Sequence, residues 1–282
     1  MKFEEYSYRH ALDIISYNKD LNEAYEDFKN VIRNITDEDL KEDYNNKKEK
    51  HEESKTAFKS LTSSINNILK ERLVELDGWK AEVDIFDSSE QDLGKIEWRL
   101  DFVYNNKICV EVAFNHREAI AWNLIKPVLA CELNPIKKKT EGTIGIYVCA
   151  DDQMKIAANM DGATGSFETV KKYLKPMESI LISPIVIIGL KPFDTFKISK
   201  DKKIIEEVKS IDKSWENEQV IITDRNNNRC KGTVVEVDED RIKIKPKSRK
   251  ASKSDTEHKE YTMDDLKFIE KDCEDKKKRN KK

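Results

Sequence analysis

Two acidic residues bracket a short predicted hairpin and could hold a metal ion. Asp101 lies near the start of the segment LDFVYNNKICVEVAF, and Glu111 stands in its second half between Val110 and Val112. A carboxylate inside an apolar strand is costly to bury unless it is paired or bound to metal. Two converging carboxylates suit Mg²⁺, which proteins hold through one or two carboxylates plus substrate phosphate. The alternative is a sheet with one polar face, on which Glu111 lies in solvent.

The elements that must position this pair belong to a predicted α/β core over residues 79–213. Asn105-Asn106 is a two-residue hairpin turn between strands Ile96–Tyr104 and Lys107–Phe114, which brings the two acids to the same end of the hairpin. A helix from Glu118 to about Leu133 follows, with Pro127 as a kink or break. The other expected elements are strands Trp79–Phe86, Thr143–Cys149 and Pro184–Leu190, and a helix Phe167–Lys175. This order predicts a mixed β-sheet with helices.

The segments on either side of the core differ from it in pattern. Residues 1–78 predict an N-terminal helical region, with Thr36 as an N-cap and a highly charged helix or helical connector over Lys41–Thr56. Residues 192–213 look like a connector. Residues 214–270 predict a small β subdomain in which Thr262 caps a helix, Met263–Glu270. A charged tail, 271–282, follows. The strands expected in the subdomain are Gln219–Ile222, Gly232–Val237 and Arg241–Ile244.

Composition restricts the class of protein. Among 282 residues, 38% are hydrophobic and 38% charged, and no apolar run reaches the length of about 20 residues that a membrane span needs. Acids follow Met1 where a signal peptide needs a basic region, so we expect a cytoplasmic protein without a membrane partner. The five cysteines form no CxxC pair, which argues against a zinc cluster. The net charge is −3, but basic residues concentrate towards the end of the chain.

The acid–hairpin–acid pattern resembles the signature of PD-(D/E)XK nucleases, and the chain is similar to BglII-type type II restriction endonucleases. VEVAF at 110–114 is similar to the VEVQF segment that carries the active site in that family. YRHALDII at 8–15 resembles the family's opening YNHADEIL stretch. IIGL at 187–190 looks like a later core strand, and KGTVV at 231–235 is similar to a KGKV segment in a C-terminal β subdomain. The resemblance implies a restriction-endonuclease-like fold.

The resemblance also implies a catalytic site with one departure. Asp101 and Glu111 would be metal ligands for Mg²⁺, the cofactor that the family uses. The family places Lys, Gln or Glu two residues after the second acid, where this chain has Ala113. Asn115, His116 and Glu118 could take the missing role, and we expect Glu118, at the start of the next helix, to be the third catalytic residue. Asp87 is either an additional carboxylate of the site or a loop acid.

The function implied is a site-specific deoxyribonuclease that makes double-strand breaks in duplex DNA at a short palindrome. A restriction–modification system would require a cognate DNA methyltransferase encoded separately. Candidate DNA-binding residues follow the catalytic strand or lie on a hairpin of the β subdomain; they are Asn115, His116, Arg117, Arg225, Asn227 and Arg229. Cutting both strands of a palindrome favours a homodimer, with the helix Ala119–Leu133 or the stripe Phe58–Leu76 at its interface.

Two other functions stay open from the sequence. Ala113 favours a catalytically silent DNA-binding or defence protein that keeps the nuclease fold. A small β-barrel RNA-binding module on a helical adaptor rests on residues 217–246 alone, and it leaves the Asp101/Glu111 pair unexplained.

Overall fold

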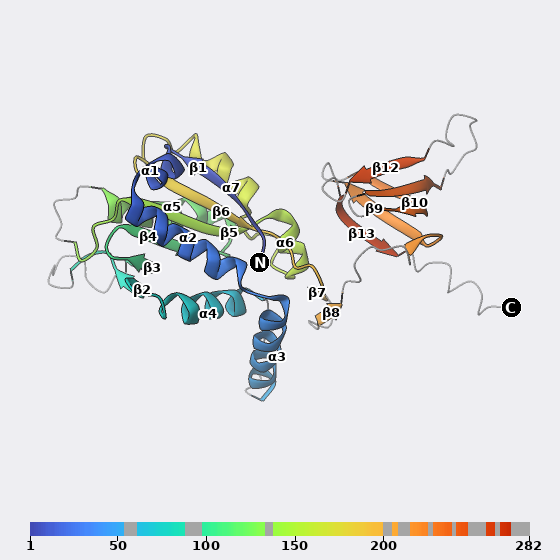
Figure 1. Cartoon of the computed structure of the whole chain (residues 1–282), viewed down its shortest axis with the longest axis horizontal. Coiled ribbons are helices and arrows are strands. Elements are labelled where there is room, and N and C mark those ends of the chain that lie inside the picture. The colour runs from blue at the N-terminus through green and yellow to red at the C-terminus, as the bar shows by residue number, and fades with distance from the viewer. Residues whose placement is uncertain are drawn as a thin grey trace. The chain divides into compact units, whose positions relative to one another are not determined.

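The chain forms two compact units, which are described separately. The computed structural model describes residues 1–53, 61–87, 98–132, 138–199, 205–207, 215–224, 228–238, 241–247, 258–262 and 266–271. The first unit is Met1–Val208 and the second is Lys209–Lys282 (Figure 1). Within these ranges, the helices are all too short or too polar to cross a membrane.

The first unit is built on a six-stranded mixed sheet with the order β1-β6-β5-β4-β3-β2. Strands β4, β5 and β6 are parallel, whereas β1, β2 and β3 pair antiparallel with their neighbours. The α/β class with a mixed sheet is therefore confirmed. The strands are β1 (Phe3–Tyr8), β2 (Trp79–Asp84), β3 (Arg99–Tyr104), β4 (Ile108–Val112), β5 (Ile144–Ala150) and β6 (Ile185–Leu190). The helices are α1 (Ala11–Tyr17), α2 (Lys19–Arg33), α3 (Asp37–Glu53), α4 (Thr62–Leu73), the 3₁₀ helix η2 (Arg117–Ala119), α5 (Ile120–Cys131), α6 (Asp152–Ala157) and α7 (Phe167–Leu174).

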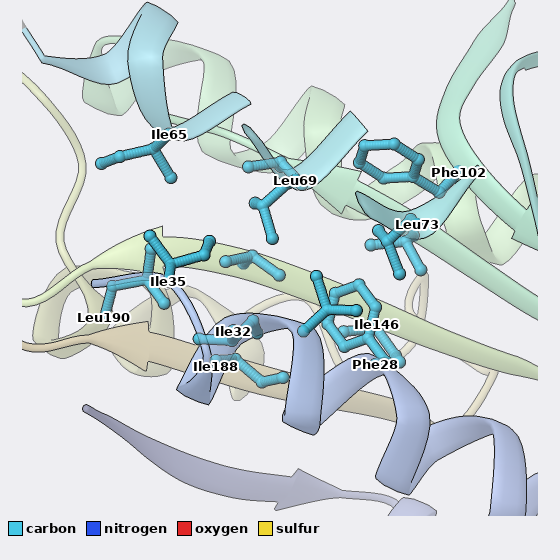
Figure 2. Close-up of a cluster of buried hydrophobic side chains, with 14 of the residues drawn as sticks. Phe28, Ile32, Ile35, Ile65, Leu69, Leu73, Phe102, Ile146, Ile188 and Leu190 are labelled. Atoms are coloured by element: carbon cyan, nitrogen blue, oxygen red, sulfur yellow. The ribbon is translucent and has the colours of Figure 1, made fainter. Parts of the chain in front are cut away.

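Two apolar layers enclose the sheet, because successive residues of a strand point to opposite faces. In β5, Ile146 packs with the core of α2 and α4, whereas its neighbour Tyr147 packs with the core of α5 and α7. Figure 2 shows the first layer, where Phe28 and Ile32 of α2 lie near Leu69 and Leu73 of α4 and the side chains of the sheet. Burial on both faces explains the nearly continuous apolar sequences of β5 and β6.

One strand lies in the region that the sequence predicts as helical. β1 pairs antiparallel with β6, with Phe3 opposite Leu190 and Tyr8 opposite Ile185. Its alternation is weak because an edge strand is only partly covered, and half of its residues are polar. Local periodicity cannot detect a pairing with a strand this far along the chain. The turn into α1 runs through Arg9 and His10, both at positive φ.

The helices follow the predicted signals closely. The Thr36 N-cap is present: Asp39 N donates to Thr36 Oγ1 at 3.1 Å, and Thr36 N donates to Asp39 Oδ2 at 2.8 Å. The described part of the charged segment belongs to the helix α3, which is held to the core through Leu40 and Tyr44. Pro127 does not break α5, although it removes one backbone donor from the helix interior.

The two apolar stripes expected at a dimer interface face the core of their own chain instead. Ile65, Leu69 and Leu73 of α4 are fully buried in the first layer, and Ile120, Leu124 and Val128 of α5 are buried in the second. Trp122 on α5 and Val74 after α4 are exposed by about half. Phe58 lies outside the described residues. The buried side chains of both stripes are therefore covered within the chain itself, and the location of the dimer interface stays a prediction.

The last part of the first unit contains a small hairpin, although residues 192–213 look like a connector in sequence. It pairs β7 (Phe196–Ile198) with β8 (Ile205–Glu207). Phe196 and Ile198 are buried against the main core, which explains why this short segment is ordered as a strand.

The second unit is a five-stranded antiparallel sheet with the order β12-β11-β10-β9-β13. Its strands are β9 (Gln219–Asp224), β10 (Arg229–Val237), β11 (Arg241–Pro246), β12 (Lys259–Thr262) and β13 (Leu266–Lys271). The helix predicted over Met263–Glu270 is wrong, because β13 occupies most of that range and pairs with β9. Met263, Leu266 and Ile269 have helical spacing in sequence. Leu266–Lys271 nevertheless pairs with β9 as a strand, with an irregularity between Leu266 and Phe268.

Candidate active site

The β3–β4 hairpin brings the two acids together. Asn105 and Asn106 adopt φ of 40° and 55°, as a tight two-residue turn requires. Phe102 then lies opposite Val110, so Asp101 and Glu111 are the next residues on the two strands. Val112 N donates a hydrogen bond of 2.6 Å to Asp101 Oδ2, which fixes this carboxylate against the start of the next segment.

Glu111 is buried and points towards α5. Its neighbours Val110 and Val112 pack into the α2/α4 layer, so the side chain between them faces the other layer. Only 4% of Glu111 is exposed, which excludes the alternative of a solvent-facing acid. Lys126 Nζ of α5 donates to Glu111 Oε1 at 2.7 Å. Glu111 Oε2 is also buried, and it has no hydrogen-bond partner among the described residues.

Burial makes both carboxylates reluctant to carry a charge. It raises the pKa of Glu111 to about 7, with a further contribution from Asp101, while Lys126 acts in the opposite direction. Burial also raises the pKa of Asp101, against the effect of the hydrogen bond from Val112. Two carboxylates in this state gain from a nearby cation that compensates their charge.

The residues present fit a divalent metal ion. An unpartnered buried oxygen on Glu111 and the adjacent carboxylate of Asp101 are hard oxygen ligands of the type that Mg²⁺ takes. Another acidic group is formed by Glu4, Asp151 and Glu168, whose ligand oxygens lie within 4.8 Å of one another. Lys191 already contacts Glu4 and Asp151 there, and Asp151 caps α6 by accepting from Met154 N at 2.6 Å.

Position 113 is occupied by alanine, whose methyl side chain can neither bind a metal ion nor orient a water molecule. Ala113 is only 3% exposed and packs in the layer formed by Ile120 and Leu124 of α5. Of the residues suggested for the missing role, Glu118 lies on η2 with its side chain exposed, and no described contact joins it to Asp101 or Glu111.

Lys126 is the site residue that the sequence analysis missed. It is the one charged residue of α5, IAWNLIKPVLAC, which is otherwise apolar apart from Asn123. A lone lysine in a buried helix that follows two candidate acids is the signal that could have indicated it. Its side chain is 19% exposed.

Asn115, His116 and Arg117 are exposed beside the 161–165 loop. Gly165 N donates to Asn115 O at 2.9 Å, and Arg117 N donates to Ala163 O at 2.9 Å. His116 Nε2 lies 3.8 Å from Asp161 Oδ2. These contacts order the backbone after β4 and leave the three side chains accessible.

The remaining predicted residues come from other parts of the chain. Arg229 is exposed at the start of β10 in the second unit, whereas Arg225 and Asn227 lie outside the described residues. Asp87 is partly buried after β2, and no described contact brings it to Asp101 or Glu111.

Comparisons with known proteins identify the family of the chain. The family model described as restriction endonuclease BglII/BglIII matches residues 3–190. No curated protein matches the chain. Among solved structures, the crystal structure of restriction endonuclease BglII complexed with a DNA 16-mer is 17% identical, with a TM-score of 0.48; the match covers 84% of this chain and 93% of that chain. The matched residues run from the first strand of the mixed sheet to its last and include the whole Asp101/Glu111 hairpin, so the chain belongs to the BglII/BglIII restriction endonuclease family.

Proposed function

We propose that this protein is a cytoplasmic type II restriction endonuclease that cuts both strands of duplex DNA at a short palindrome with Mg²⁺ as cofactor. The observation that carries the proposal is the buried pair Asp101 and Glu111, whose free oxygen and unfavourable burial both call for a cation. A separately encoded DNA methyltransferase would protect the host's own sites.

Asp101 and Glu111 would hold the Mg²⁺ ion. When bound, the ion would supply a lowered pKa for the attacking water and would stabilise the charge that builds up on the phosphate. The oxygen of the water attacks phosphorus in line, and the bond from phosphorus to the 3′ oxygen breaks. The products are a 5′-phosphate and a 3′-hydroxyl. The hydrogen bond from Val112 N keeps Asp101 oriented during this step.

Exposed polar residues after β4 would read the DNA. Asn115, His116 and Arg117 stand directly beyond the strand that carries Glu111, so a base edge in the groove would be near the scissile phosphate. Arg and Asn side chains suit guanine and adenine, respectively. Arg229 in the second unit, with Arg225 and Asn227, would contact the backbone or a further base.

The decisive test measures cleavage of mixed plasmid DNA in a buffer that contains Mg²⁺. It compares Asp101→Asn and Glu111→Gln with the wild-type protein. Each variant should lose cleavage and keep DNA binding, because removing a negative charge cannot weaken contact with an anionic backbone. Glu75→Gln, an exposed acid outside the site, is the control for charge and should cut normally. Cleavage by both site variants at the wild-type rate would contradict the assignment.

A second candidate function follows from Ala113. A DNA-binding or defence protein that keeps the nuclease fold without catalysis would bind DNA and leave every plasmid intact with Mg²⁺. End mapping of the digested DNA separates the two functions, since a site-specific enzyme produces one repeated end sequence.

A further inference from the structure

We infer that Lys126, supplied by α5, is a catalytic residue that takes the role left open at Ala113. The inference rests on the proposed nuclease function. It assigns the role to a residue 13 positions further along the chain and on a different element, in preference to Glu118, Asn115 or His116.

The first support is the direction of the side chains. Glu111 and Ala113 lie on the same face of β4, because they are two residues apart. α5 covers that face, and Ala113 packs beside Ile120 and Leu124 of this helix. The Lys126 ammonium reaches the same space from the helix and contacts Glu111 Oε1 at 2.7 Å. A small side chain at 113 leaves this space to Lys126.

The second support is charge. Lys126 also acts electrostatically on Asp101, so its ammonium lies near both acids of the site. Among the basic side chains of the described residues, Lys126 is the one that donates a hydrogen bond to Asp101 or Glu111. The chain therefore concentrates two carboxylates and one ammonium at a single point, the residue types that this chemistry needs.

The third support is the way the fold fixes the position of α5. Pro127 follows Lys126 and packs on Gly145 of β5, where a Cβ would lie 2.9 Å from Pro127 Cβ. The helix therefore lies close to the sheet beside Lys126. A lysine held by such packing, with its side chain only partly exposed, is oriented before substrate arrives.

The role follows from the three donors of an ammonium group. One donor serves Glu111, and the others can orient the attacking water and a non-bridging oxygen of the scissile phosphate. The proton lost by the water goes to solvent, and the departing 3′ oxygen takes a proton from solvent. The positive charge of Lys126 stabilises the additional negative charge of the transition state.

The test uses a supercoiled plasmid that the wild-type protein cuts, under single-turnover conditions. Lys126→Met should slow cleavage by about a hundredfold or more. The control is Lys172→Met, which removes an exposed lysine from α7 and should leave the rate within about threefold. The key variant is the relocation Ala113→Lys combined with Lys126→Ala, which returns the lysine to the family's position. It should cut at least about tenfold faster than Lys126→Ala alone.

A readout independent of cleavage separates catalysis from support of the fold. Lys126→Met should bind Mn²⁺ in the absence of DNA at least as tightly as the wild-type protein, because a nearby ammonium repels the cation. A residue that merely holds Glu111 in place would weaken Mn²⁺ binding when removed. Urea denaturation of each variant shows whether it is folded at the assay temperature.

Three outcomes would overturn the inference. Lys126→Met could cut within threefold of the wild-type rate, or Glu118→Ala could show the hundredfold loss in its place. Alternatively, Mn²⁺ affinity and cleavage could fall together in Lys126→Met, with no recovery in the relocated variant. Wild-type protein that cuts no DNA with Mg²⁺ overturns the proposed function itself, and the inference with it.

Discussion

Glu111 shows the conflict between stability and function at the scale of a single residue. A buried carboxylate with an unpartnered oxygen costs free energy in the metal-free protein. The cost is concentrated where the proposed cation would bind, because Lys126 satisfies one oxygen and leaves the other open. A glutamine at the same place would relieve the charge and remove the ligand.

This conflict predicts a pH-dependent difference in stability between the wild-type protein and Glu111→Gln. The pKa of Glu111 is raised from 4.5 to about 7 in the folded protein. The folded state therefore holds the proton more tightly than the unfolded chain, and the resulting stabilisation is lost as the pH rises through 7. The loss should amount to about 3 kcal/mol above pH 7. In metal-free buffer, Glu111→Gln should be more stable than wild type at pH 8, and the difference should shrink or disappear at pH 4.5.

Urea denaturation at the two pH values, with a chelator present, measures this difference. Addition of Mg²⁺ at pH 8 should recover stability in the wild-type protein and have little effect on Glu111→Gln. An equal difference between the two proteins at both pH values would show that Glu111 does not titrate in this range.

The sequence indicated part of this site and missed the rest for a physical reason. Asp101 and Glu111 could be predicted from the sequence because the hairpin turn between their strands brings them together in space. Lys126 comes from a helix packed across the sheet, and its contact with Glu111 depends on how closely α5 approaches β4. Spacing along the chain does not encode that distance. Glu118 looked suitable for its place at the start of a helix, yet it is exposed.

At the scale of elements, the position of α5 depends on a residue in another strand. Gly145 of β5 leaves room for Pro127, and an added methyl group would lie 2.9 Å from Pro127 Cβ and 3.3 Å from Ile185 Cγ1. Both neighbours belong to packed layers, so α5 would have to move away from the sheet. Because α5 carries Lys126, this packing also sets the contact with Glu111.

Gly145→Ala should therefore lower both stability and cleavage. Overpacking a core position costs about 1–3 kcal/mol in unfolding free energy. The accompanying shift of α5 should also slow DNA cleavage in protein that is fully folded. Gly162→Ala is the matched control for stability, since its added methyl group would meet no atom within 4 Å. Chemical denaturation and single-turnover assays give the two effects separately; unchanged stability in Gly145→Ala would contradict the packing argument.

Elements with strong local patterns were predictable from sequence, and the edge strands β1 and β13 were not. The β3–β4 hairpin and β5, β6 and α5 have long apolar runs or clear turns, and the structure has them close to the predicted bounds. β1 and β13 are edge strands, whose conformation depends on a partner strand. β13 even shows helical spacing in sequence. The conformation of such segments depends on pairing with a distant strand, and the local sequence pattern does not indicate that pairing.

At the scale of the whole molecule, the proposed double-strand cut requires two active sites related by a two-fold axis. We therefore expect a homodimer, at least on DNA. Sedimentation of the protein with and without a DNA duplex containing its site should show a species of twice the 32.9 kDa chain mass. A monomer under both conditions that still breaks both strands in one event would contradict the dimer. The same measurement on Trp122→Ala tests whether the exposed side chain of α5 belongs to the interface.

The pairing of β1 with β6 has a consequence for how the protein is made. Residues 3–8 leave the ribosome first, but their partner strand is residues 185–190. At typical rates of synthesis of about 5–20 residues per second, β1 waits about ten seconds or more for its neighbour. Helices α1 and α2 can form in that interval, because their contacts are local. The sheet can close only when β6 emerges, and closing so long a loop is slow. A translational pause shortly before residue 185 would therefore prolong the exposure of the apolar strands β4 and β5 to other chains.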